Sequence, residues 1–194
     1  VQRTFMRSIV KSKLPVYYTE GFNPIPKLVF ASPLSVGSAG ENELAQIKLT
    51  EDVSDADVKA ALSAAMPEDI LIHEVYTPTV DFKKIKWAEN EIVLVGDYSE
   101  ADLEKVKALL AGPMVVLKRT KSTEKEVDIS QFVKSAVANL ECGNIVINAV
   151  TCADNTNFLN PSYVAKAAMK ALDNKGYFTV VRKQLLGEDC KIFR

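Results

Sequence analysis

The sequence has little of the chemistry that metal centres and disulfide frameworks require. It contains one histidine and three cysteines, and Cys142, Cys152 and Cys190 form neither a Cys-x-x-Cys pair nor an even set. Secreted domains pair their cysteines as disulfides, and closely spaced Cys and His side chains hold structural zinc. We therefore expect no metal and no disulfide, and we expect the three cysteines to be small buried side chains.

Long apolar runs and a strong excess of charge are also absent. No stretch stays apolar over the roughly 20 residues that a membrane-spanning helix needs, and no secretory signal with a basic start and a cleavage site is present. Lys and Arg number 24 against 25 Asp and Glu, and 47% of the residues are hydrophobic. We therefore expect an ordinary folded protein with no membrane partner, located in the cytoplasm.

Motifs for nucleotides and cofactors are missing as well. The sequence has no Gly-x-Gly-x-x-Gly after a strand, no P-loop, no His-Glu-x-x-His and no cysteine triplet for an iron–sulfur cluster. The only histidine, His73, falls within a predicted strand, where packing or hydrogen bonding accounts for it better than proton transfer. We therefore expect no cofactor, and we do not expect the chain to be an enzyme on its own.

Basic residues gather at the start of the chain. Residues 1–40 carry five Lys and Arg side chains and a single acid, Glu20. Apolar residues recur with helical spacing over residues 2–13, and three basic residues follow one another at steps of four, namely Arg3, Arg7 and Lys11. Such a stripe is either the solvated side of an amphipathic helix or a row of contacts to phosphates.

A rigid loop follows within residues 14–37, LPVYYTEGFNPIPKLVFASPLSVG. Pro24 and Pro26 fix φ and favour extended geometry in the residues before them, while Gly21 permits a turn. The candidate binding residues of this loop are Tyr18, Glu20, Phe22, Asn23, Lys27 and Ser32. Aromatic rings beside cations are typical of sites for single-stranded nucleic acid; alternatively, Phe22 and a tyrosine pin the loop to the core.

The remaining segments predict an α+β protein with a repeated order of elements. In the first half we expect strands over 28–34 and 43–50, a helix opened by Ser54-x-x-Asp57, and a strand over 70–76. The second half predicts strands over 89–96, 114–119, 134–140, 145–150 and 177–185, with helices after Ser99 and after Asn160-Pro161 and an insertion at about 121–134.

This order predicts two tandem ferredoxin-like (βαββαβ) domains. The first covers residues 1–77 and contains the signature loop 14–37, and the second covers residues 89–194. Residues 78–88, with Pro78 and several lysines, predict a connector. Because helical periodicity begins directly after Val1, we expect the leading strand of the first domain to lie upstream of this chain.

The first forty residues resemble the bacterial radical SAM-linked proteins, also called domain of unknown function 2344, and residues 125–129, KEVDI, extend the resemblance over the whole chain. The signature of that family reads roughly M-R-x-F-x-R-A-x-R-R-A-G-L-P, then Y-S-x-G-F-N-P-H-P-K-I, then S-P-L-x-x-G. The chain keeps Arg3, Phe5, Arg7, Leu14, Pro15, Tyr18, Gly21, Phe22, Asn23, Pro24, Pro26, Lys27, Ser32, Pro33, Leu34 and Gly37. It departs from the family at Ile25, which is usually His, and at Thr19, which is usually Ser.

The resemblance implies an accessory protein whose partner is a radical SAM protein. Since Ile25 replaces the family's histidine, the loop is expected to bind rather than to catalyse. Our leading hypothesis is a non-catalytic RNA-binding or substrate-presenting module that acts with a radical SAM enzyme. The alternatives are an RNA-modifying or RNA-processing enzyme that uses the loop from Tyr18 to Lys27, with Glu20 and Lys27 as acid and base, and a protein-interaction scaffold.

Overall fold

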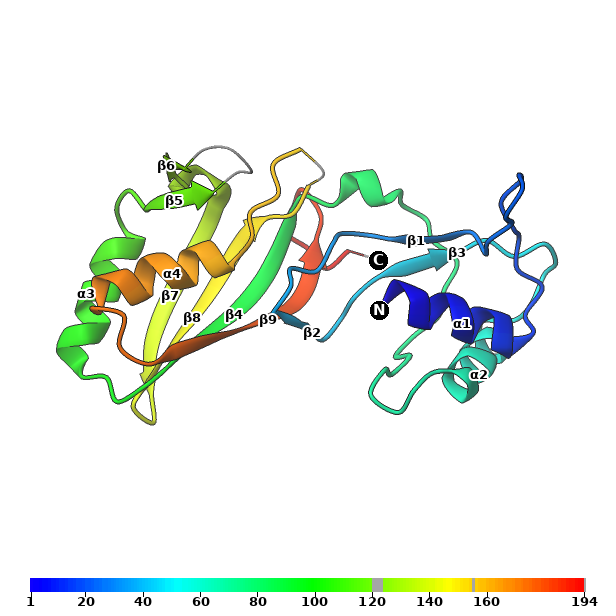
Figure 1. Ribbon diagram of the computed structural model, residues 1–194, viewed down its shortest axis with the longest axis horizontal. Helices are drawn as coiled ribbons and strands as arrows, with labels where there is room; N and C mark the ends of the chain where they lie inside the picture. Colours follow the sequence, from blue (N-terminus) through cyan, green and yellow to red (C-terminus); the bar gives the residue numbers. More distant parts are fainter. Residues whose placement is uncertain (120–123, 155, 194) are drawn as a thin grey trace. The chain divides into compact units, whose positions relative to one another are not determined.

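The computed structural model describes residues 1–119, 124–154 and 156–193. The chain folds into two compact units: residues 1–31 and 44–81 form the first, and residues 32–43 and 82–193 form the second (Figure 1). The segment 32–43 therefore leaves the first unit and returns to it, although it lies inside the first predicted domain, 1–77. The unit boundary near residue 81 falls within the predicted connector 78–88.

The first unit packs two helices against a small sheet. Its elements are α1 (Gln2–Ser12), β1 (Leu28–Phe30), β3 (Ala45–Ile47) and α2 (Asp55–Ala65). β1 and β3 are antiparallel, with Leu28 opposite Ile47. The buried centre consists of Ile9, Val16, Val58 and Leu62. The hydroxyl of Ser8 on α1 donates a hydrogen bond of 3.1 Å to the carbonyl of Ala65 at the end of α2.

The residues between α2 and the second unit do not form the strand predicted over 70–76. No strand occurs from residue 66 to residue 86, all of which are described. Ile72 and Val75 still pack against the core, so side-chain burial alone explains the apolar alternation that predicted a strand. Described residues of the first unit thus form a two-stranded sheet, β1-β3, and the tandem pair of ferredoxin-like sheets is not confirmed.

His73 lies in this same segment and is exposed. Its carbonyl accepts a hydrogen bond of 2.7 Å from the Lys59 ammonium. The prediction that His73 lies within a strand is therefore wrong, and its exposure also contradicts a packing role for the imidazole. The prediction that all three cysteines are buried is also wrong, because Cys142 is exposed and Cys152 and Cys190 are half-buried.

The second unit is built on a five-stranded sheet in the order β2-β9-β4-β8-β7. Its elements are β2 (Ala39–Gly40), η1 (Phe82–Lys84), β4 (Trp87–Val95), α3 (Glu100–Leu110), β5 (Val115–Arg119), β6 (Glu124–Asp128), η2 (Ser130–Phe132), β7 (Val133–Glu141), β8 (Asn144–Cys152), α4 (Ser162–Ala171) and β9 (Tyr177–Leu186). β5 confirms the strand predicted over 114–119 and pairs with β6 in a separate two-stranded sheet. β6 lies in the predicted insertion at 121–134, of which residues 121–123 lie outside the described residues.

Residues alternate in burial along the strands of the second unit, which places its core on one face of the sheet. β4 alternates between buried and half-buried residues, and the side chains of Ile92 and Leu94 are fully buried. They join Ile145 and Ile147 of β8 and Val164 of α4 in one cluster. The elements predicted over 89–96, 134–140, 145–150 and 177–185 are confirmed as β4, β7, β8 and β9. In the described part of the chain, no helix is long and apolar enough to cross a membrane.

Of the two capping boxes predicted from sequence, the one at α3 is complete, whereas α2 has only the cap by the Ser54 side chain. The Ser54 hydroxyl accepts from the Asp57 amide at 3.2 Å, and Ser99 and Asp102 form a reciprocal box at the start of α3. Hydrogen bonds from the Lys105 ammonium and then from the Ser99 backbone lower the pKa of Asp102 from 3.8 to about 2. Both caps satisfy amides that would otherwise lack an intrahelical partner.

We expect the capping box at Asp102 to make the free energy of unfolding depend on pH in the acidic range. Because the folded pKa of Asp102 lies below its unfolded value, its stabilising effect is present above about pH 4 and is lost as the pH falls through about 2. A ¹³C NMR titration should place the midpoint of the Asp102 carboxyl at about 2. The free energy of unfolding should fall less on acidification in Asp102→Asn than in the wild type.

A neighbouring acid on α3 provides the control. Glu104 pairs with the Lys107 ammonium at 2.9 Å on the helix surface, and Glu104→Gln removes the same charge without touching the cap. The acid dependence of unfolding should therefore persist in Glu104→Gln. A midpoint near the ordinary value of 3.8 for Asp102 would show that the box does not hold in solution.

Candidate nucleic-acid interface

The signature loop of the first unit folds as a short hairpin. Tyr18 forms an antiparallel bridge with Pro26, the Thr19 amide donates to the Ile25 carbonyl at 2.9 Å, and the Ile25 amide donates to the Thr19 hydroxyl at 3.2 Å. Gly21 has a φ of 129°, a conformation that residues with a Cβ rarely adopt. Figure 1 shows this loop in dark blue, projecting past the start of β1.

The tip of the hairpin presents an aromatic ring to solvent. Phe22 is fully exposed, at 106%, and Tyr18 is 43% exposed. Glu20, Asn23 and Lys27 are also exposed. The alternative in which Phe22 pins the loop to the core is therefore wrong, because the ring is not buried by any described part of the chain. The loop holds a large apolar side chain in water on a backbone that is fixed by internal hydrogen bonds.

The basic stripe lies on the solvent side of α1. Arg3, Arg7 and Lys11 are exposed, whereas Ser8 and Ile9 face inward. Within the described residues, none of the three cations has a carboxylate within ion-pair distance. Their charges are therefore available to an external anion.

Packing within the first unit connects α1 to the sheet that carries the loop. The ring of Phe5 on α1 meets the ring of Phe30 on β1 edge-on, with centroids 5.3 Å apart. Edge-to-face pairs of this kind hold two elements in a defined orientation. The stripe and the loop thus belong to one folded body, although they lie on different elements.

Ser32 differs from the other predicted binding residues. It belongs to the second unit and is only 5% exposed. Its carbonyl accepts from Nη2 of Arg182 at 3.1 Å, and its hydroxyl accepts from Nη1 at 3.4 Å. The prediction of Ser32 as a surface contact for a ligand is therefore wrong, since the residue is occupied by a contact inside the fold.

Arg182 is the residue that anchors segment 32–43 to the second unit. Its side chain lies on β9, is buried, and forms an ion pair with Glu43 in which Nε donates to Oε1 at 2.8 Å. Nη1 also donates to the Pro33 carbonyl at 3.1 Å. β2 pairs in parallel with β9, placing Gly40 opposite Arg182. The sequence carries no clear signal for this contact, because Arg182 is followed by Lys183 and Gln184 in the same strand.

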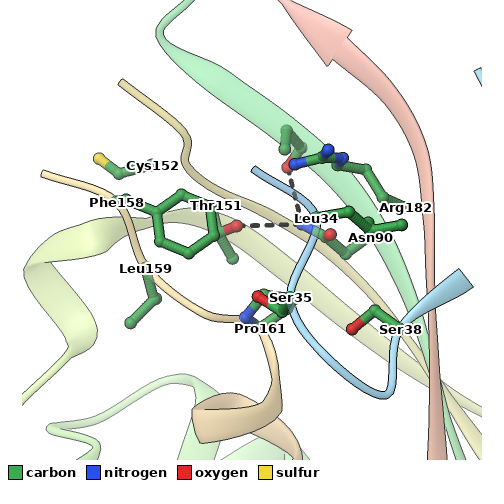
Figure 2. Close-up of a pocket in the computed structure, with 11 residues that line it drawn as sticks. Leu34, Ser35, Ser38, Asn90, Thr151, Cys152, Phe158, Leu159, Pro161 and Arg182 are labelled. Atoms are coloured by element: carbon green, nitrogen blue, oxygen red, sulfur yellow. Dashed lines mark hydrogen bonds between the residues drawn. The ribbon is translucent and has the colours of Figure 1, made fainter. Parts of the chain in front are cut away.

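Figure 2 shows the cavity beside this anchor. Ser35 and Ser38 line one side, and Asn90 and Thr151 of the sheet line the other, with the Asn90 amide donating to the Thr151 hydroxyl at 3.0 Å. The cavity volume is about 10 Å³, which is close to the space of a single water molecule. It is therefore too small for a substrate.

Cys152 also lines the cavity, but its thiol is not activated. Burial, followed by the nearby charge of Asp154, raises the pKa of the Cys152 thiol. A thiol with a raised pKa stays protonated near neutral pH and is a poor nucleophile. The cavity therefore lacks the activated group that a catalytic cysteine would need.

Comparison with known protein families gives a match for the chain. A family described as uncharacterized protein conserved in bacteria (DUF2344) matches residues 1–161, which include the signature loop, α1 and most of the second unit. A search of curated proteins gives no match. The chain belongs to the DUF2344 family of uncharacterized bacterial proteins.

Proposed function

We propose that the protein binds single-stranded RNA through its first unit and does so without chemistry of its own. The observation that carries the proposal is the fully exposed ring of Phe22 on a rigid hairpin. Burying a phenylalanine stabilises a fold by about 1.5–3 kcal/mol, a gain that this loop forgoes. A nucleotide base stacked on the ring would recover it, and stacking of this kind tolerates any base sequence.

Charge supports RNA over an uncharged partner. Arg3, Arg7 and Lys11 are exposed and have no carboxylate within ion-pair distance in the part of the chain that the structure describes, and residues 1–40 contain a single acid, Glu20. Cations that contact phosphates supply most of the sequence-independent affinity for nucleic acids. A scaffold for another protein remains the second candidate, because Ile25 beside Phe22 is half exposed as well.

The proposal has two further parts: a radical SAM protein as the partner, and a ferredoxin-like fold for the second unit. The radical SAM partner rests on the resemblance of the signature loop, and a pull-down of that protein with this chain tests it. The strand order β9-β4-β8-β7 together with α3 and α4 supports a ferredoxin-like second domain. Such domains host many unrelated functions, so the RNA proposal depends on the loop and not on this fold.

Replacing Phe22 with alanine should weaken binding to a mixed-sequence single-stranded RNA by about 1–3 kcal/mol, or roughly 5- to 150-fold. The expected loss is that of one base stacked on the ring. Fluorescence anisotropy with a labelled oligonucleotide measures it, and the slope of affinity against salt should not change, because no charge is removed.

Val36→Ala is the matched control, since Val36 is an equally exposed apolar residue, at 101%, in the second unit. Its affinity for RNA should equal that of the wild type. Melting curves of both variants should match the wild type, because neither side chain is buried. Wild-type protein that binds no single-stranded RNA, or Phe22→Ala with unchanged affinity, would overturn the proposal.

A further inference from the structure

Backbone hydrogen bonds connect three residues of the first unit at the base of the signature loop, namely Tyr17, Lys27 and Lys48. The Tyr17 amide donates to the Lys48 carbonyl at 2.7 Å, the Lys27 amide donates to the Tyr17 carbonyl at 2.9 Å, and the Lys48 amide donates to the Lys27 carbonyl at 3.3 Å. The three residues come from separate segments of the chain. Backbone hydrogen bonds therefore fix their relative positions before any ligand arrives.

The side chains of these residues lie on the open face of the small sheet. Leu28 and Ile47, the chain neighbours of the two lysines, pack inward against the helices. Successive side chains of an extended strand point to opposite faces, so Lys27 and Lys48 point away from α1 and α2. Both lysines are exposed, whereas Tyr17 is half-buried.

The ammonium groups of both lysines make cation–π contacts with the ring of Tyr17. Nζ of Lys48 lies 4.4 Å from the ring centroid and Nζ of Lys27 lies 5.9 Å from it. The two cations are therefore no more than about 10 Å apart. Among the described residues, neither has a carboxylate within ion-pair distance. Each ammonium group is free to contact a phosphate, and the acid beside the ring is Glu20, whose carboxylate accepts from the Tyr17 hydroxyl at 3.4 Å.

We infer that Tyr17, Lys27 and Lys48 form a phosphate-binding site for the same RNA strand that stacks on Phe22. This inference rests on the proposed function and adds a second contact to it. Phe22 lies four residues from each of the two bridged residues, Tyr18 and Pro26. Even a fully extended chain of that length spans no more than about 13 Å, so the ring lies within reach of a short RNA strand held at the base of the loop. Lys27 and Lys48 would hold the backbone while Phe22 holds a base.

The test is the salt dependence of RNA binding in Lys27→Gln/Lys48→Gln. Each phosphate contact contributes about 0.7 to the log–log slope for a single strand, so the slope should become shallower by about 0.7–1.4. The control, Lys84→Gln/Lys118→Gln, removes two exposed lysines from the second unit and should leave the slope unchanged. NMR shifts of the lysine ε-methylenes provide a readout in the wild type that does not depend on any variant folding.

The outcomes separate this inference from the proposed function. A shallower slope in the loop variant alone, with ε-methylene shifts of Lys27 and Lys48 on adding RNA, supports the site. If the wild type binds RNA and the two double variants keep equal slopes, the site is overturned while the Phe22 contact stands. If the wild type binds no RNA, both are overturned. Equal ε-methylene shifts with inorganic phosphate alone would reassign the site to free phosphate and overturn its role in holding the strand.

Discussion

Replacing Arg182 with methionine should lower the free energy of unfolding of the second unit by about 3–5 kcal/mol. Methionine retains most of the apolar stem but removes the guanidinium donors that contact Ser32, Pro33 and Glu43. The carbonyls of Ser32 and Pro33 would then lose their partner, and the Glu43 carboxylate would lose its counter-charge. A buried acceptor without a partner costs about 1–3 kcal/mol by itself, so the expected effect is large.

The adjacent lysine provides a control in the same strand. Lys183 pairs with Glu41 of the same segment at 2.5 Å, but both side chains are partly exposed to solvent. Lys183→Met should therefore cost no more than about 1 kcal/mol. Hydrogen exchange followed by mass spectrometry measures both variants locally: amides of β2 should exchange faster in Arg182→Met and should change little in Lys183→Met. Equal protection in the two variants would show that Arg182 does not anchor the segment.

Local signals in the sequence were enough to locate most of the helices and strands. Ser54 and Ser99 each precede an acid by three residues, and both form the predicted caps because a capping box involves only neighbours in sequence. The hairpin of β7 and β8 was likewise predictable from two apolar runs separated by a turn. In each case the stabilising contacts lie within a few residues of the signal.

Contacts between distant residues could not be predicted in this way. The segment 32–43 joins the second unit through a pairing of two residues with β9 and through Arg182, which lies about 140 positions further along the chain. No periodicity marks a strand of two residues. The strand predicted over 70–76 failed for the related reason that apolar alternation reports burial, whereas a strand also needs a neighbour with free backbone groups.

In the candidate site too, features set by neighbouring residues were predictable, whereas contacts between distant residues were not. Gly21 and the prolines predicted a rigid loop, because turn chemistry is local. Whether the Phe22 ring is exposed or pins the loop to the core was left open by the sequence, since that depends on residues distant in the chain. Lys48 was missed, since only the pairing of its strand with Tyr17 and Lys27 brings its ammonium to the base of that loop. Ser32 was wrongly included because a serine beside a proline in a loop carries no sign that a distant arginine will bury it.

Reversing the charge of two residues on α1 should produce the largest loss of RNA affinity. Arg3 and Arg7 are four residues apart, which places them about 6 Å from each other along the exposed side of the helix. If each neutralises one phosphate, losing both contacts lowers affinity by about 25-fold at 0.1 M salt, and the new negative charges add repulsion. The log–log slope of Arg3→Glu/Arg7→Glu should be shallower than that of the wild type by about 1.4.

Loss of folding is not expected to account for this effect. The first turn of α1 contains no acidic residue, and a Glu at position 3 would interact favourably with the positive end of the helix dipole by about 0.3–1 kcal/mol. The melting temperature of the double variant should therefore stay at or above that of the wild type. Lys84→Glu/Lys118→Glu, with the same change of charge in the second unit, should retain full affinity. Unchanged RNA affinity in folded Arg3→Glu/Arg7→Glu would remove the helix stripe from the RNA interface and favour the protein-interaction scaffold.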